Sequence, residues 1–188
     1  MTLRIAPLLL LVLVPAACSG GETKTDDSSA TNDTEADTDT DTDTDTDATN
    51  VLINEIVASN KTSAYDETGA AADWVELYNP GSSAADIGGY NFTDDVEGEG
   101  WAIPSGTTID AGGYLLIWCD GDTEDGALHT DFRLDADGET LTLQDGTGTS
   151  LDEVEFPTLG EDQAYARIPD GSETWDVSDT PTPEAANE

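Results

Sequence analysis

The side chains with the clearest chemical potential are carboxylates crowded into short loops. The segment 120–126 carries four of them, namely Asp120, Asp122, Glu124 and Asp125. Oxygen ligands at such short spacing suit Ca²⁺, which takes about six to eight of them. The segment departs from the EF-hand pattern, because Asp125 stands where that loop has its sixth-position glycine. Two interpretations follow, a weak calcium site and a solvated acidic surface, and we expect the second, with no dedicated cofactor.

A second acidic loop allows the same two interpretations. It contains Asp94 and Asp95, followed by Glu97 and Glu99. Its carboxylates are also closely spaced, but no pattern of a known metal-binding loop accompanies them. We expect a solvated surface here as well.

Two further glutamates, Glu55 and Glu76, stand out because each lies inside an apolar run that is typical of a strand. A pair of carboxylates can act as acid and base in catalysis, as it does in glycoside hydrolysis. The alternative is a position at a sheet edge or on the surface, where water solvates the charge. We expect the exposed position for both.

The remaining reactive groups are few. His129 is the only histidine, and alternation with Asp131 and Arg133 predicts that it faces solvent. No nucleophile motif accompanies it, whereas a catalytic triad needs a base that is oriented by its partners. Metal clusters built on several histidines or cysteines are excluded by the composition. Cys119 ends an apolar run and precedes Asp120, so we expect a buried, unreactive thiol, since a reactive one needs positive surroundings.

Short strands separated by turns must position these residues. No window shows a clean helical period, and the pattern predicts an all-β immunoglobulin-like sandwich over residues 51–188. The run Gly113–Cys119 is apolar on both faces and predicts a central strand, while residues 128–134 alternate like a strand with Phe132 inward. The expected members of one common core are Trp74, Leu116, Trp118, Phe132 and Leu141.

The N-terminus indicates export. Arg4 precedes the apolar run Ile5–Val14, and small residues follow, so residues 1–17 are interpreted as a signal peptide. The run is too short for a membrane-spanning helix, which needs about 20 residues. The end of the segment resembles a lipobox of bacterial lipoproteins, although Pro15 stands where leucine is usual. The resemblance implies that Cys18 is lipidated and anchors the chain to a membrane, with a plain secreted protein as the alternative.

Residues 18–50 are interpreted as a disordered, lipid-anchored linker. From Ser19 to Asn50 there is no aromatic and no large aliphatic side chain, and Asp37–Asp47 alternates strictly between Asp and Thr. Such a segment cannot bury enough apolar surface to offset the entropy of ordering. The whole chain has 42 acidic and 5 basic residues, a net charge of −37. This charge argues against binding to nucleic acid, which requires clustered Lys and Arg.

Ordered motifs along residues 51–188 resemble the lamin tail domain, an immunoglobulin-like sandwich. The segments that carry the resemblance are Leu52–Asn60, Asp73–Pro80, Ile87–Tyr90 with Thr93-Asp94, Ala111–Trp118, Leu128–Leu134, Gly138–Leu141, Tyr165–Arg167, Pro169–Gly171, Trp175 and Thr180–Asn187. The resemblance implies the sandwich fold and tethering or accessory roles, without shared catalytic residues.

We therefore expect a non-enzymatic protein of the cell envelope. Its domain would act outside the cytoplasm as a binding or tethering module for an envelope or extracellular protein. A passive structural component and an accessory subunit of an exported hydrolase are the alternatives. Ser19 after Cys18 provides no retention signal by resemblance to bacterial sorting rules, which favours the outer membrane.

Overall fold

The computed structural model describes residues 50–95, 98 and 100–188. The predicted signal peptide, Cys18 and all but the last residue of the predicted linker lie outside the described residues. Within the described part of the chain, no helix has the length and apolar character needed to cross a membrane.

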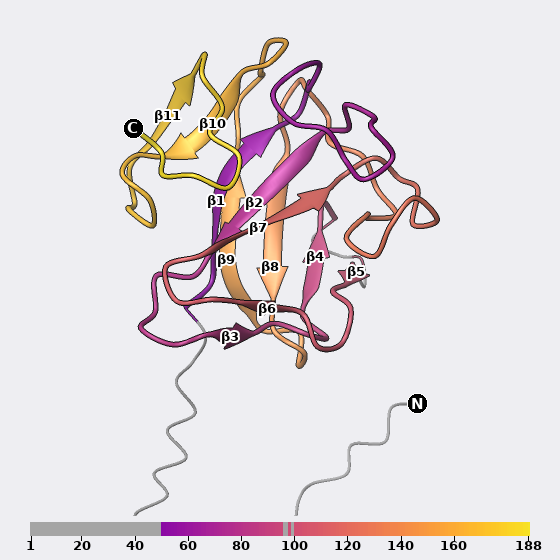
Figure 1. Cartoon of the computed structure of the whole chain (residues 1–188), viewed down its shortest axis with the longest axis vertical. Helices are drawn as coiled ribbons and strands as arrows, with labels where there is room; N and C mark the ends of the chain where they lie inside the picture. Colours follow the sequence, from indigo (N-terminus) through magenta and orange to yellow (C-terminus); the bar gives the residue numbers. More distant parts are fainter. Residues whose placement is uncertain (1–49, 96–97, 99) are drawn as a thin grey trace, which may run out of the picture. The chain divides into compact units, whose positions relative to one another are not determined.

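The described residues form an all-β domain of antiparallel strands in three sheets (Figure 1). The largest sheet has the order β11-β10-β1-β2-β7; its strands are β1 (Leu52–Val57), β2 (Trp74–Tyr78), β7 (Tyr114–Trp118), β10 (Ala164–Arg167) and β11 (Trp175–Ser178). The second has the order β5-β4-β8-β9; its strands are β4 (Asn91–Thr93), β5 (Trp101–Ala102), β8 (Thr140–Gln144) and β9 (Ser150–Glu155). A short pair, β3 (Ala85–Asp86) and β6 (Thr108–Ile109), forms the third. The predicted sandwich is confirmed.

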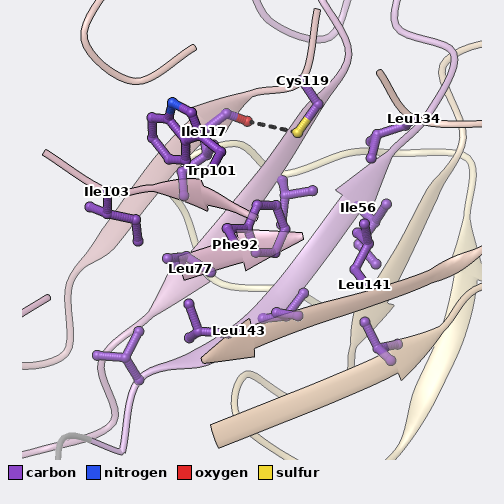
Figure 2. Packing of buried hydrophobic residues seen from close by; sticks show 14 of the residues in the cluster. Ile56, Leu77, Phe92, Trp101, Ile103, Ile117, Cys119, Leu134, Leu141 and Leu143 are labelled. Carbon is purple, nitrogen blue, oxygen red and sulfur yellow. Dashed lines mark hydrogen bonds between the residues drawn. The ribbon is translucent and has the colours of Figure 1, made fainter. Parts of the chain in front are cut away.

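The main core forms because strand alternation turns one face of each large sheet toward the other. From the first sheet Ile56, Leu77 and Ile117 point inward, and from the second Phe92 and Leu141 meet them (Figure 2). All five are fully buried. Burial of a large aliphatic or aromatic side chain contributes about 1.5–3 kcal/mol to folding, so this layer is the principal source of stability.

A second apolar cluster covers the opposite face of the larger sheet. Trp74 and Trp118 belong to it, and Leu116 packs against its margin. The loop between β1 and β2 covers this face, and its Ser63 hydroxyl accepts a hydrogen bond from the Trp74 indole at 3.1 Å. The prediction of one common core is therefore wrong for these three side chains. Of the other two, Leu141 lies in the main core and Phe132 is only half-buried against it.

Strand β7 lies at one edge of its sheet, so the prediction of a central strand is wrong. Its apolar character has another cause, because Ile117 lies in the main core on one face and Trp118 lies in the second cluster on the other. The chain after β7 returns alongside its end: the Trp118 N–H donates to the Leu128 carbonyl, and the Thr130 N–H donates to the Trp118 carbonyl, both at 2.8 Å. Residues 128–134 do not form the predicted alternating strand. His129 and Thr130 are neighbours in sequence, and both are buried.

Candidate functional site

Two clusters of titratable side chains stand out among the described residues, because each has fully buried members. We name Glu55 and Glu76 the carboxylate pair. Both lie on the face of the larger sheet that points away from the main core. The register of β1 and β2 shifts between Ile53 and Glu55, and this bulge sets Glu55 directly opposite Glu76. Two acids thus come together on neighbouring strands through an irregularity in the pairing.

Both members of the carboxylate pair have an exposed fraction of 0%. The expectation of an edge or surface position is therefore wrong. The cause is the closing segment, residues 180–188, which folds over this face: the Thr182 N–H donates to Glu55 Oε1 at 3.0 Å, and the Glu184 N–H donates to Glu76 Oε2 at 2.6 Å. The remaining oxygens are also engaged, since the Thr182 N–H is shared with Glu55 Oε2 and the Asn54 amide donates to Glu76 Oε1, both at 3.2 Å.

Burial controls the protonation of this pair. Removal from water raises the pKa of Glu55 to about 7, although the bonds from Thr182 oppose the shift. Burial likewise raises the pKa of Glu76 to about 8, and the charges of Glu55 and Asp170 add to it. Asp170 itself accepts the Tyr114 hydroxyl at 2.6 Å. These enclosed carboxyl groups hold the closing segment through its backbone N–H groups.

We name Asp66, Glu67, Asp120 and His129 the histidine cluster. His129 has an exposed fraction of 0%, so the prediction of a surface histidine is wrong. Its ring lies between two carboxylates, with Nδ1 2.9 Å from Asp120 Oδ2 and Nε2 3.2 Å from Glu67 Oε2. Burial alone would lower the pKa of His129, but the two carboxylates outweigh it and the net shift is upward. The imidazolium form can donate to both partners at once.

Asp66 comes to this cluster from the loop between β1 and β2, far from Asp120 and His129 in sequence. Its Oδ1 accepts the Thr68 N–H and hydroxyl, each at 2.8 Å, and the Ala70 N–H at 2.9 Å. Its Oδ2 has no hydrogen-bond partner, although the residue is only 7% exposed. Burial would raise the pKa of Asp66, but the bonds from Thr68 and Ala70 hold it below its ordinary value. A carboxylate is thus enclosed with one oxygen unsatisfied.

The absence of a side chain at Gly126 leaves room for Glu67 and His129 of the histidine cluster. A Cβ atom at this position would lie 1.9 Å from Glu67 Oε1 and 2.8 Å from His129 Cδ2. Real Cβ atoms do not approach other atoms so closely, so any larger residue would displace the glutamate or the ring. The glycine lets the loop after β7 pass close to His129 and Glu67.

The predicted calcium residues do not converge on one point. Asp120 is half-buried in the histidine cluster, whereas Asp122, Glu124 and Asp125 are exposed. In the loop itself, Asp120 Oδ1 accepts the Asp122 N–H, and Asp122 Oδ1 accepts the Glu124 N–H. Among the described residues, the group whose donor atoms could meet on one ion is Asp66, Asp120 and His129, all within 4.8 Å of one another.

The other predicted residues are placed as follows. Asp94 is half-buried and Asp95 is exposed in the second acidic loop, whereas residues 97 and 99 lie outside the described part of the chain. Cys119 is buried in the main core, and its Sγ lies 3.8 Å from the Ile117 carbonyl oxygen. Figure 2 draws this contact as a dashed line. The prediction of a buried cysteine is confirmed, and burial raises the pKa of this thiol.

Comparison with known proteins agrees with this architecture. The family described as Lamin Tail Domain matches residues 44–158, which is more than half of the chain. A search of curated proteins found no match. The match includes both β1 and β2 and the whole histidine cluster, while β10, β11 and the closing segment lie beyond it. With its immunoglobulin-like sandwich and this match, the chain belongs to the lamin tail domain family.

Proposed function

We propose that this protein is a non-enzymatic lipoprotein of the cell envelope, which displays its lamin tail domain as a binding or tethering module. The observation that carries the proposal is that the reactive side chains of the domain are buried within the fold. His129, Cys119, Glu55 and Glu76 are all buried and engaged with other parts of the fold. These groups stabilise the domain or hold an ion, which suits a module that presents a surface.

The surface itself indicates what kind of partner would suit such a module. Among the described residues, the large hydrophobic side chains that are exposed are Tyr65, at 59%, and Val177, at 42%. Scattered single side chains of this kind are ordinary on a soluble surface and do not form an apolar patch. Residues 51–188 carry 31 acidic and 3 basic residues, a difference of −28. The charge favours a basic partner or a contact bridged by cations.

The N-terminal sequence supplies the second half of the proposal. Residues 1–17 have the features of a signal peptide, and Cys18 would carry the lipid. Several acyl chains hold durably in a membrane, because each buried CH₂ contributes about 0.8 kcal/mol. The acidic linker 18–50 would then act as a stalk that separates the domain from the membrane surface.

The two cysteines provide a matched test of the anchor. Cells that produce the full chain would be grown with a labelled fatty acid, and their membranes would be separated from soluble protein. We expect Cys18→Ala to abolish the label and to release the protein or block its processing. Cys119→Ala should remain labelled and in the membrane fraction. An unlabelled wild-type chain whose mature N-terminus lies beyond Cys18 in intact mass spectrometry would contradict the anchor.

Site-specific photo-crosslinking tests the binding role of the anchored chain in its native envelope. A crosslinker at Tyr65 samples the loop beside the histidine cluster, and one at Val177 samples the free edge of β11. A binding module should give a discrete protein adduct from one of these positions and not from the other. If neither position yields a discrete adduct, the passive structural role is favoured over the binding role.

A further inference from the structure

We propose that Asp66, Asp120 and His129 bind a divalent transition metal ion of the zinc class. The three side chains come from two separate loops, one between β1 and β2 and the other after β7. One donor atom from each lies within 4.8 Å of the other two. Around tetrahedral Zn²⁺, with bonds of about 2.0–2.2 Å, donor atoms stand about 3.4 Å apart. The 4.8 Å limit lies above this spacing, and the 2.9 Å between His129 Nδ1 and Asp120 Oδ2 lies below it, so binding would require side-chain shifts of about 1 Å.

One buried oxygen of Asp66 has no hydrogen-bond partner, which also points to a bound cation. A buried carboxylate oxygen without a partner costs the desolvation of a charged group with no compensating bond. Oδ1 of the same carboxylate already accepts three bonds within its own turn, which fixes the orientation of the side chain. Oδ2 is left without a partner. A cation between this aspartate, Asp120 and His129 would satisfy that oxygen.

The surroundings of His129 match those of metal-binding histidines. In such sites the ring nitrogen that does not bind the metal usually donates to a carboxylate, a carbonyl or water, which fixes the ring. Each nitrogen of His129 has a carboxylate beside it, Asp120 on Nδ1 and Glu67 on Nε2. Because Asp120 is one of the proposed ligands and lies beside Nδ1, the ion would bind Nδ1, and Nε2 would donate to Glu67.

The donor set selects the kind of ion. Calcium and magnesium prefer oxygen ligands alone, and calcium takes about six to eight of them. One imidazole nitrogen with two carboxylates suits Zn²⁺, which combines nitrogen and oxygen donors in fourfold coordination. Three protein ligands leave one of the four positions, which a water molecule would fill.

The test uses the purified full chain, stripped of metal with EDTA and returned to buffer at high NaCl, where diffuse charge effects are screened. We expect one zinc ion per chain by elemental analysis after desalting. Zinc at about a hundred times its dissociation constant should raise the melting temperature by about 5–10 °C. Calcium and magnesium chlorides at the same concentration should shift it by much less.

Two variants and one control locate the effect. Asp66→Asn keeps an oxygen for the bonds from Thr68 and Ala70, and His129→Gln keeps a polar side chain; both should lose the bound zinc and the thermal shift. The control replaces Asp122, Glu124 and Asp125 by their amides and should retain both. Melting curves in EDTA show whether each variant is folded.

The proposal fails on any of three results. The first is a wild-type chain that retains no zinc in high NaCl, which needs no variant to interpret. The second is equal retention by wild type and folded Asp66→Asn. The third is loss of zinc in the control, which would assign binding to the exposed acidic loop instead.

Discussion

The carboxylate pair and the histidine cluster both contain buried carboxylates, but the oxygen atoms of these carboxylates differ in their hydrogen bonding. All four oxygens of Glu55 and Glu76 accept hydrogen bonds from the chain, mainly from the closing segment. In the histidine cluster, Asp66 Oδ2 accepts none. Burial alone therefore does not mark a ligand site. A buried carboxylate oxygen that has no hydrogen-bond partner in the protein is the better indication.

The two groups also differ in what a lost partner would do. Removal of the closing segment would leave Glu55 without its donors and Glu76 with only the Asn54 amide, on an open sheet face. The histidine cluster is held by local turns, such as the one around Asp66, and by the packing of His129 beside Trp118. We therefore expect the pair to control stability and the cluster to control ion binding.

The pH dependence of folding should show the largest effect. In the folded state Glu55 and Glu76 keep their protons up to a pKa of about 7 and about 8, whereas the ordinary value is 4.5. Between these values the folded chain binds more protons than the unfolded chain. The free energy of unfolding must then fall as the pH rises through this window. From pH 5 to pH 9 we expect the pair to contribute a loss on the order of 5 kcal/mol.

A neutral variant isolates this contribution. Glu76→Gln cannot ionise, so urea denaturation across the same pH range should show a loss smaller by at least about 2 kcal/mol. The pKa of His129 is also raised in the folded state, so its contribution to the free energy of unfolding also falls as the pH rises. Wild type and variant share this contribution, so it does not affect their difference. Glu153→Gln, at an exposed position of β9, is the matched control and should keep the wild-type slope. Equal slopes for Glu76→Gln and wild type would show that Glu76 is ionised in the folded state.

The attachment of the closing segment should show the next largest effect. The Asn187 side-chain amide donates to the carbonyls of Asn54 and Arg167, and its Oδ1 accepts the Thr182 hydroxyl. Asn187→Ala leaves these buried groups without partners and should lower the free energy of unfolding by about 2–4 kcal/mol. Glu188→Ala, one residue further, should change it by less than about 0.5 kcal/mol. Near-identical denaturation curves for the two variants would mean that the closing segment does not hold the pair.

The metal-free histidine cluster should show the smallest effect on folding. Asp66→Asn retains the oxygen that accepts the bonds from Thr68 and Ala70, and it removes a buried charge. In EDTA we expect its free energy of unfolding to lie within about 1 kcal/mol of wild type. A loss above about 3 kcal/mol in urea denaturation would show that the Asp66 charge serves an essential ion pair with His129, which would remove the contrast with the carboxylate pair.

Alternation in the sequence was sufficient for much of the fold, because side chains with period two mark the faces of a strand wherever the pairing is regular. It placed Ile56 and Leu77 on their strands and Cys119 in a buried position. It failed where the chain is irregular. Residues 128–134 alternate in sequence, but they run beside β7 through isolated bridges, so His129 is buried instead of exposed.

The candidate sites depended on contacts that spacing does not reveal. The closing segment reaches Glu55 and Glu76 from more than a hundred residues away, and it converts exposed strand positions into enclosed ones. Asp66 meets Asp120 and His129 only after two loops fold together. The density of carboxylates in residues 120–126 indicates a loop that does reach His129, but only Asp120 of its four carboxylates belongs to the histidine cluster.

Anomalous diffraction from a crystal of the protein soaked in zinc, recorded at the zinc absorption edge, tests the difference between the two groups most directly. We predict one strong peak between Asp66, Asp120 and His129, and no peak at Glu55 and Glu76. A peak confined to the exposed Asp122, Glu124 and Asp125, or to the carboxylate pair, would contradict the account. A zinc-soaked crystal that shows no ordered zinc would contradict it as well.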